Sequence, residues 1–409
     1  MKVYIFSEVS LFQGMSSSQR VRCYVRALLG EGVDVECLNY IRTEYRTEDS
    51  PGHKRKGIFN GIPYRFTAAS PYRSKSFALR HIADYCDMFL ACLFVLFKVH
   101  RGDVLISYHE RFGVFKRIII ALLHLKGAKY FRELCELPYG TGIETPKHIK
   151  LREREQRLIF PHCDGVIAIS DALADYARKY CRKDAEIVKI PILVDYDKYN
   201  LESKEGIESR EADIQYIFHS GALTEPKDGI LGMIEAFGMV CSKVEGQLRF
   251  VCTGRKEKSP CAKEIDALIA KYNLQDKVVF TGYLSDEQLK DYLRRATLVI
   301  INKYPNQRNT YCFSTKLGEY MAAGKAIIIT EVGEAMNWLT PGKDAMIISP
   351  CDKEALAEAI IKLTADAALR RSLGENARET CKRCFDYRVW GRTMVKMVLN
   401  VLKVKKGQK

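Results

Sequence analysis

Apolar β-branched runs alternate with stretches of helical periodicity along most of the chain. Runs of this kind are typical of buried strands in parallel sheets, and the stretches between them of amphipathic helices. In the first half we expect strands at residues 3–7, 34–38, 104–107, 129–134, 166–169 and 187–190, and helices at 18–29, 76–99, 112–125 and 171–180. The pattern predicts a doubly wound α/β domain.

A polar stretch, residues 195–209, interrupts this alternation, which then begins again. We expect strands at 216–219, 248–253, 278–280, 298–301, 326–330 and 345–348, and helices at 230–240, 285–295 and 353–364. The sequence therefore predicts a first Rossmann-like domain (1–195), a linker (196–213), a second Rossmann-like domain (214–385), and a C-terminal helix with a basic tail (386–409). Doubly wound sheets bind ligands beyond the carboxyl ends of their strands, so we expect the site in a cleft that the two domains face.

Charge and cysteine content narrow the class of protein. The 409 residues carry a net charge of +15, and residues 51–150 hold 17 basic against 7 acidic side chains. This excess is not interleaved with aromatic residues as in a nucleic-acid module, so we expect no nucleic-acid partner. The 14 cysteines are irregularly spaced, which favours reduced thiols in a cytoplasm. The apolar run 88–97 is half the length of a membrane span, so we expect none.

The segment NTYCFSTKLGEYMAAGKAIIIT, residues 309–330, carries the clearest chemistry. We expect a helix to begin near Ser314 or Thr315 and to end at Gly324. Its N-terminus presents free N–H groups, and Lys316 adds a cation there, so the turn suits a phosphate. Glu319 shares a face with Lys316 and can accept hydrogen bonds from a ribose diol. The alternative is a surface Lys–Glu pair on an ordinary helix.

This segment resembles the donor-site signature of retaining GT-B glycosyltransferases of family four. The resemblance places Glu319 at the second glutamate of the E-x7-E pattern, which grips the ribose of a nucleotide sugar, and Tyr311 where the first glutamate stands. It implies two Rossmann-like domains and a final helix that crosses back to the first. Further segments that match in order and spacing assign the donor site to Gly14, Lys227, Arg255, Gly282, Tyr283, Ser314, Thr315, Lys316 and Glu319. Lys227 and Arg255 can equally be solvated side chains.

The first domain offers the candidate catalytic residues. The segment FRELCELP, residues 131–138, resembles the family's strand that runs into an acidic motif near the reacting sugar. Glu133 is the first candidate for activating the acceptor or stabilising charge, Glu136 the second, and His109 competes with them. Each of the three, taken alone, is more often a surface or packing residue.

We expect no metal. Asp195 and Asp197 spell D-x-D but fall beside the expected linker, and Cys381 and Cys384 form a single C-x2-C pair without a second. Lysines and a helix terminus can neutralise a departing diphosphate without an ion.

The sequence thus predicts a cytoplasmic, metal-independent hexosyltransferase with no cofactor and a nucleoside diphosphate sugar as substrate, with UDP or GDP as the expected nucleotide. Its acceptor is a glycan or a polyprenyl-diphosphate-linked glycan of bacterial surface polysaccharide assembly, and the basic excess suggests contact with the inner face of an anionic membrane. A nucleotide-sugar 2-epimerase of the same shape and a non-catalytic, transferase-like binding protein remain the alternatives. An epimerase would need paired carboxylates and histidines around the sugar, and the only histidine of the second domain is His219. Tyr311, which stands in place of the first glutamate, leaves the non-catalytic binding protein as an alternative.

Overall fold

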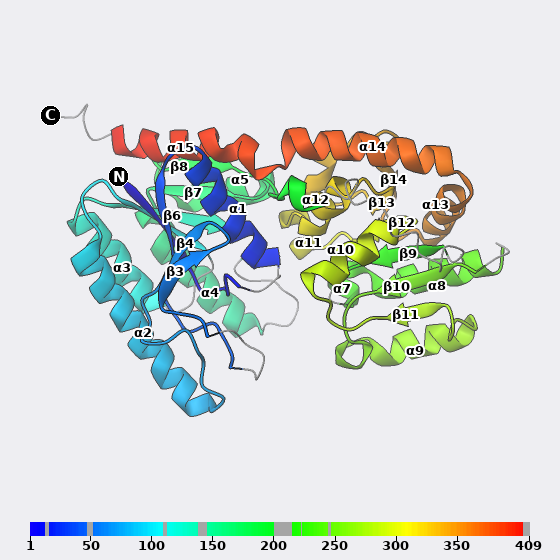
Figure 1. The fold of residues 1–409 in the computed structure, drawn as a ribbon, viewed down its shortest axis with the longest axis horizontal. Coiled ribbons are helices and arrows are strands. Elements are labelled where there is room, and N and C mark those ends of the chain that lie inside the picture. The colour runs from blue at the N-terminus through cyan, green and yellow to red at the C-terminus, as the bar shows by residue number, and fades with distance from the viewer. Residues whose placement is uncertain are drawn as a thin grey trace. The chain divides into compact units, whose positions relative to one another are not determined.

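The computed structural model describes residues 1–12, 16–46, 52–108, 113–137, 145–199, 215–221, 223–243 and 247–403. The chain divides into two compact units (Figure 1). Unit 1 comprises Met1–Pro191 and Tyr387–Lys409, and unit 2 comprises Ile192–Asp386. Each is an α/β unit built on one sheet, as the sequence predicts.

Unit 1 holds an eight-stranded sheet of order β3-β4-β2-β1-β5-β6-β7-β8. All neighbouring strands are parallel except β3 and β4. The strands are β1 (Lys2–Ser7), β2 (Asp34–Asn39), β3 (Lys56–Phe59), β4 (Ile62–Phe66), β5 (Val104–Tyr108), β6 (Lys129–Leu134), β7 (Gly165–Ala168) and β8 (Glu186–Lys189). Six of them match the expected runs.

The hairpin of β3 and β4 was missing from the sequence prediction. Asn60 and Gly61 join the two strands, with φ of 48° and 79°. Both angles are positive, as a type I′ turn requires, and Asn-Gly is the commonest sequence for it. The dipeptide was the signal that could have revealed this hairpin.

The long helices of unit 1 are α1 (Ser16–Gly30), α2 (Phe77–Lys98), α3 (Gly113–Leu125), α4 (Pro146–Ile159), α5 (Asp171–Tyr180) and α15 (Tyr387–Lys403). The chain's last helix, α15, packs on α1 and β8, so the expected return of the C-terminal helix to the first domain is confirmed. A Cβ at Gly391 would lie 2.7 Å from the backbone oxygen of Ala27, which shows how closely α15 approaches α1.

Unit 2 holds a six-stranded, wholly parallel sheet of order β11-β10-β9-β12-β13-β14. Its strands are β9 (Tyr216–His219), β10 (Arg249–Cys252), β11 (Val278–Phe280), β12 (Leu298–Ile301), β13 (Ile327–Thr330) and β14 (Met346–Ile348). Its helices are α6 (Tyr196–Tyr199), α7 (Glu225–Asp228), α8 (Ile230–Cys241), α9 (Ala262–Lys271), α10 (Asp286–Arg295), α11 (Gln307–Tyr311), α12 (Thr315–Ala322), α13 (Lys353–Ala365) and α14 (Ala367–Cys384).

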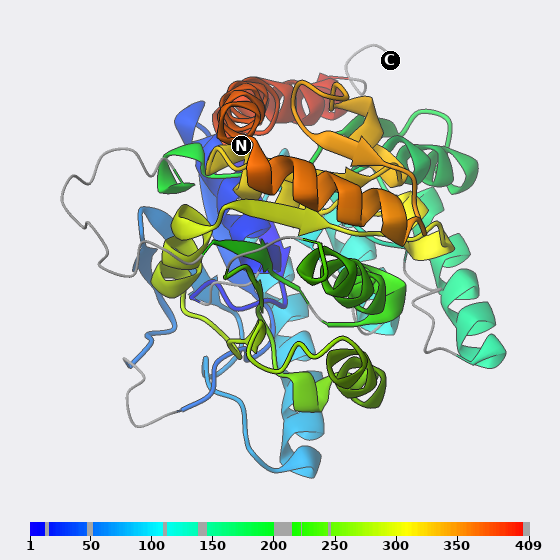
Figure 2. The same cartoon turned by 90° about the vertical axis from the view of Figure 1, so that its right-hand side faces the viewer.

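Buried aliphatic and aromatic side chains join this sheet to its helices. α8 and α13 pack side by side (Figures 1 and 2). Their apolar faces meet those of β9, β10, β12 and β13 in one core that includes Ile217, Phe237, Phe250, Ile300 and Ile360. A local signal fixes one helix start: Ser285 and Gln288 form a capping box at the start of α10, which the sequence predicts as the helix 285–295. No helix in the described ranges is long and apolar enough to span a membrane.

Candidate functional site

The strand order of unit 2 defines where a ligand is expected. The chain moves outward from β9 to β11 on one side of the sheet and then crosses to β12 on the other. The change of direction lies between β9 and β12, whose carboxyl ends are followed by Ser220 and Asn302. Doubly wound sheets bind ligands at such a point, beyond the carboxyl ends of the strands.

Three polar side chains converge there on Gly221, which follows β9. A Cβ built on Gly221 would lie 2.5 Å from Nε2 of His219, 2.7 Å from Nζ of Lys316 and 2.9 Å from Oδ2 of Asp228. Real Cβ atoms do not approach other atoms so closely, so only glycine fits among these groups. Its backbone N–H donates to Thr253 Oγ1 at 3.1 Å, which holds the loop against the end of β10.

Asp228 and Lys316 form the central ion pair. The Lys316 ammonium donates to Asp228 Oδ1 at 2.5 Å, and the Asp228 side chain is almost completely buried. Burial opposes ionisation of Asp228, but Lys316, His219 and Lys303 hold the pKa of this carboxyl well below its usual range. Asp228 therefore carries its negative charge at neutral pH.

Lys303, two residues beyond β12, is a second buried cation. Its Nζ donates to Asn309 Oδ1 at 3.2 Å and to the backbone oxygen of Lys227 at 3.4 Å. Burial, together with the nearby Lys316 ammonium, lowers the pKa of Lys303 to about 8, while the Asp228 carboxylate acts in the opposite direction and Lys227 contributes least. Two lysines, Lys316 and Lys303, therefore act on the Asp228 carboxylate, and Lys227 adds a third positive charge near Lys303.

His219, the last residue of β9, is fully buried beside this cluster. Its Nδ1 lies 3.0 Å from the carbonyl oxygen of Ile300, which can only accept, so Nδ1 carries the proton. Burial lowers the pKa of His219 to about 4, and Lys316 contributes to the shift, so the ring is neutral at pH 7. Its Nε2 has no hydrogen-bond partner within the described ranges.

Helix α12 directs its N-terminus at the same region. It begins at Thr315, as the sequence predicts, and its N-cap Ser314 makes no side-chain hydrogen bond to the first turn. Lys316 lies in that turn, and the hydroxyl of Tyr320 accepts from the backbone N–H of Ser220 at 2.8 Å. The helix dipole adds to the positive charge of the lysines, which makes the end of β9 suited to an anion.

Glu319 lies one turn further along α12, against α6. Burial raises the pKa of Glu319, whereas the Lys198 ammonium and a hydrogen bond with Tyr199 act in the opposite direction. Lys198 also pairs with Asp286 at 3.0 Å. Residues 196–199, which we expected in a linker, thus form a helix of unit 2 beside Glu319; residues 200–213 of the expected linker lie outside the described residues.

The structure groups the remaining predicted donor residues at the ends of β10 and β11. Gly254 and Gly282 form an isolated bridge, in which the Gly254 N–H donates to the Gly282 oxygen at 2.8 Å. The Arg255 guanidinium lies 5.5 Å from the ring centroid of Tyr283, which is 75% exposed. A Cβ at Gly254 would lie 3.2 Å from the Gly221 oxygen, so this group adjoins the cluster around Gly221.

The candidate catalytic residues lie in unit 1. Glu133, in β6, accepts from Arg20 Nε at 2.7 Å and from the Tyr24 hydroxyl at 3.3 Å, and its side chain is 1% exposed. Its Oε2 has no hydrogen-bond partner within the described residues. Glu136 lies two residues beyond β6 and is partly exposed. His109, like Gly14 of the predicted donor site, falls outside the described residues.

Sequence reasoning missed several members of the unit 2 cluster. Asp228 stands between two residues of the loop that we compared with the family, Lys227 and Gly229. Lys303 and Asn309 follow β12, where polar residues at a strand end were an available signal. No group of three or more His, Cys, Asp or Glu side chains in the described parts of the chain is arranged to hold a metal. The absence of a metal from the reaction stays a prediction.

The comparisons with known proteins agree with this architecture. Residues 202–380 match the family described as glycosyl transferases group 1. The chain is 25% identical to the mannosylfructose-phosphate synthase of Agrobacterium fabrum, over 53% of this chain and 48% of that protein. It is 21% identical to the N-acetyl-alpha-D-glucosaminyl L-malate synthase of Bacillus anthracis, over 80% of this chain and 84% of that protein. It is 26% identical to the putative teichuronic acid biosynthesis glycosyltransferase TuaC of Bacillus subtilis, over 54% of this chain and 52% of that protein. The chain thus spans about half the length of the first and third of these relatives.

Solved structures share the whole fold. Sucrose-phosphate synthase from Thermosynechococcus elongatus has a TM-score of 0.71 at 18% identity, and the alignment covers 98% of this chain and 99% of that one. HepE from Anabaena in complex with UDP has a TM-score of 0.69 at 14% identity, with 97% and 99% covered. The chain has the GT-B fold, as expected, and the matched family segment together with this fold supports a GT-B glycosyltransferase.

Proposed function

We propose that unit 2 binds a nucleoside diphosphate sugar and that the protein transfers the sugar to an acceptor with retention of configuration. The observation that carries the proposal is the cluster at the end of β9, where Lys316 pairs with Asp228, Lys303 lies near both, and Lys227 adds positive charge near Lys303. The excess positive charge and the N-terminus of α12 suit the diphosphate of the donor. The group 1 match over residues 202–380 supports the same reaction class.

The reaction breaks the bond between C1 of the sugar and a diphosphate oxygen and forms a bond from C1 to an acceptor hydroxyl oxygen, which loses its proton. The nucleoside diphosphate leaves with one more negative charge than it had in the donor. The lysine cluster stabilises that developing charge without a metal ion or cofactor, which is the electrostatic term that commonly dominates catalysis. The unprotonated Nε2 of the neutral His219 ring can accept a hydrogen bond from the sugar nucleotide.

The predicted donor residues of unit 2 have a place in this scheme. Glu319 grips the ribose diol, with Lys198 and Tyr199 fixing its carboxylate. Arg255, Gly282 and Tyr283 lie on the side of the nucleoside. We propose UDP or GDP as the nucleotide; HepE, which shares the fold, is seen with UDP. Of the two predicted catalytic glutamates, Glu136 is partly exposed and would take the proton of the acceptor hydroxyl or stabilise charge, whereas Glu133 is 1% exposed and paired with Arg20, which suits a positioning role.

The proposed acceptor is a glycan or a polyprenyl-diphosphate-linked glycan of a bacterial surface polysaccharide, met at the inner face of an anionic membrane. The name of the TuaC relative, which refers to teichuronic acid biosynthesis, supports this class. The basic excess of residues 51–150 supports an anionic partner.

A thermal-shift titration with UDP, GDP, ADP, CMP and dTDP tests the donor site. A ligand at a hundred times its dissociation constant stabilises the fold by about 2.7 kcal/mol. We expect one diphosphate to raise the melting temperature of the wild type and Glu319→Ala to abolish the shift, while Glu375→Ala, on the exposed side of α14, retains it. If no nucleotide shifts the wild type, the donor site is refuted.

Incubation with the matching sugar nucleotide then separates the alternatives. Release of the free diphosphate that depends on a glycan acceptor supports transfer. A new epimer formed from the sugar nucleotide alone indicates an epimerase. Tight binding without turnover in the presence of a panel of lipid-linked acceptors indicates a binding protein.

A further inference from the structure

Helix α2 of unit 1 has apolar side chains on two sides. Met88, Ala91, Cys92 and Val95 face the core and are buried. A second set is exposed to solvent: Phe77, Ile82, Tyr85, Phe89, Leu96 and Phe97. A surface helix ordinarily has one apolar stripe, directed at the core, so the second set calls for a partner.

Helix α3 continues this exposed apolar surface. α2 and α3 lie side by side (Figure 1), with the rings of Tyr85 and Phe115 6.2 Å apart. Val114, Ile118 and Leu125 are exposed on α3. Contiguous apolar patches of this kind mark sites of association with a protein or a membrane. We call the exposed apolar residues of the two helices the α2–α3 face.

The exposed charges on the two helices of the α2–α3 face are of one sign, although the Glu155 carboxylate of α4 lies beside the first residue of α3. The acidic residues of α2, Asp84 and Asp87, are buried and pair with Arg73 at 3.3 Å and Arg42 at 3.1 Å. Helix α3 contains no acidic residue. Neither helix, each described over its full length, exposes a carboxylate, whereas Lys98 and Arg117 are exposed. The face therefore complements an anionic surface and would repel a second copy of itself.

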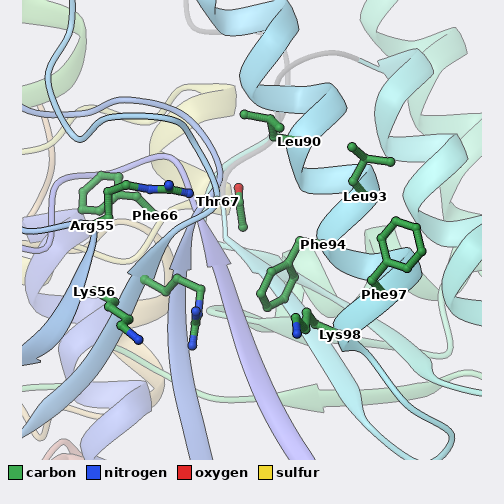
Figure 3. Close-up of a pocket in the computed structure, with 10 residues that line it drawn as sticks. Arg55, Lys56, Phe66, Thr67, Leu90, Leu93, Phe94, Phe97 and Lys98 are labelled. Carbon is green, nitrogen blue, oxygen red and sulfur yellow. The ribbon is translucent and has the colours of Figure 1, made fainter.

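A pocket of about 470 Å³ lies beside this face, between the β3–β4 hairpin and the C-terminal half of α2. Figure 3 shows its two sides: Arg55 and Lys56 on the strand side, and Leu90, Leu93, Phe94 and Phe97 on the helix. Lys98 lies at one end. Arg65 also lines the pocket but pairs with Glu36 at 2.8 Å. The pocket thus combines an apolar wall with cations.

Thr67 gives the pocket an unused hydrogen-bonding group. Its side chain is 6% exposed, and its Oγ1 has no hydrogen-bond partner within the described ranges. Buried polar atoms in proteins nearly always have a partner. In Figure 3 the Thr67 hydroxyl lies between the cationic side and the apolar wall, where a ligand with both kinds of group would place a polar atom.

We propose that the α2–α3 face docks on an anionic bilayer and that this pocket holds one anionic glycerophospholipid of that bilayer. Arg55, Lys56 and Lys98 donate to the phosphate, Thr67 bonds a headgroup or glycerol oxygen, and the acyl chain follows the wall of Leu93 and Phe97. A free phosphate would leave this apolar wall without a counterpart. The inference gives the membrane partner of the proposed function a surface, and it does not depend on the transfer reaction.

Flotation of the full chain with vesicles tests the proposal without any sugar nucleotide. We expect binding to vesicles of phosphatidylcholine containing about 30% phosphatidylglycerol, no binding to phosphatidylcholine alone, and release at high salt. Phe89→Ser with Phe97→Ser removes side chains that are 57% and 68% exposed. This double variant should weaken binding about tenfold or more, and Lys56→Glu with Lys98→Glu similarly.

Two control variants change similar exposed residues elsewhere. Leu151→Ser on α4 and Lys263→Glu on α9 should bind these vesicles as the wild type does. Thr67→Val tests the pocket separately from the face. It should melt at the same temperature as the wild type or higher, because it removes an unpartnered hydroxyl, yet bind the anionic vesicles severalfold more weakly. An unchanged nucleotide-induced thermal shift in each variant shows that unit 2 is intact.

Several results would overturn the proposal. The double variants could bind anionic vesicles as well as the wild type does, or the wild type could bind phosphatidylcholine alone equally well. Inorganic phosphate or glycerol 3-phosphate at millimolar concentration could release the protein completely. Sedimentation could instead show a dimer that Phe89→Ser with Phe97→Ser dissociates, which would make this face an interface between copies.

Discussion

Each unit buries a carboxylate beyond or near the carboxyl end of a parallel strand, and the two carboxylates are held in different ways. In unit 1, Glu133 meets one guanidinium, that of Arg20, whose other nitrogens donate to the backbone oxygens of Ile190 and Pro191 at 3.0 and 2.6 Å. In unit 2, Asp228 meets Lys316 directly and lies near Lys303 and His219.

The difference lies in the balance of charge. Arg20 and Glu133 neutralise each other. The guanidinium links α1 to β6 and to the segment after β8, so the pair stabilises the packing of these elements in unit 1. In the unit 2 cluster two lysines, Lys316 and Lys303, act on one carboxylate, Asp228, and the proposed diphosphate would balance the remaining positive charge. A buried ion pair by itself therefore does not indicate a ligand site. A buried cluster of charged side chains with a net charge does.

Breaking the Arg20–Glu133 ion pair should have the largest effect on stability. Arg20→Ala leaves Glu133 buried without its cation, and we expect the free energy of unfolding of unit 1 to fall by about 3–5 kcal/mol. Urea unfolding monitored by circular dichroism measures this change. Arg178→Ala, which breaks the exposed pair with Asp175, should cost at most about 1 kcal/mol. Equal losses of unfolding free energy in the two variants would refute the stabilising role of the Arg20–Glu133 pair.

Removing the central cation of unit 2 should act on ligand binding more than on stability. Lys316→Met leaves Asp228 with Lys303 nearby, so we expect a smaller loss of stability than for Arg20→Ala. Calorimetric titration with UDP and GDP should show binding weakened by about 1.5–3 kcal/mol, the range of a hydrogen bond to a charged group. Lys290→Met, which breaks the exposed pair with Glu287, is the control and should bind as the wild type does. An unchanged affinity in Lys316→Met would remove the cluster from the donor site.

Filling the space at Gly221 should perturb the same cluster sterically. The Cβ of Gly221→Ala would contact His219, Lys316 and Asp228, and we expect about 1–3 kcal/mol of destabilisation together with weaker nucleotide binding. Thermal unfolding with and without nucleotide measures both effects. Gly30→Ala, where a Cβ meets no atom within 4 Å, should be neutral or stabilising. A stable Gly221→Ala protein with full affinity would contradict the close packing.

A pH series gives the smallest effect. The pKa of Lys303 is lowered to about 8, so this lysine is charged below that value and loses its proton as the pH rises through it. Affinity for a nucleoside diphosphate should therefore fall by about 1 kcal/mol between roughly pH 7 and pH 9. Lys303→Gln should bind more weakly at neutral pH and show a flatter profile, while Lys290→Gln should follow the wild type. A steeper fall in Lys303→Gln would exclude Lys303 as the titrating group.

The sequence predicted much of the fold because strands and helix ends are local features. The β-branched runs placed the strands of both sheets, Ser285 and Gln288 announced a helix start, and Gly324 announced a helix end. The hairpin at Asn60-Gly61 and the helices α4, α9 and α14 were not predicted, because turn dipeptides and highly charged helices do not appear in the alternation of apolar strands and amphipathic helices. The resemblance to the family's donor-site segments named Lys316, Gly282 and Arg255 as candidates, and their role in binding stays a prediction.

By itself, the sequence determined the two α/β series, the excess of basic residues and the residue types at the strand ends. Only the tertiary structure decided which of those residues interact. Arg20 and Glu133 are 113 residues apart, and Asp228 and Lys316 are 88 apart, so no local pattern indicates that either pair exists. Burial and the neighbouring charges then set the pKa of His219 and Lys303, and the packing leaves Thr67 Oγ1 without a hydrogen-bond partner among the described residues. These properties depend on atoms that folding brings together and that the linear order of residues leaves far apart.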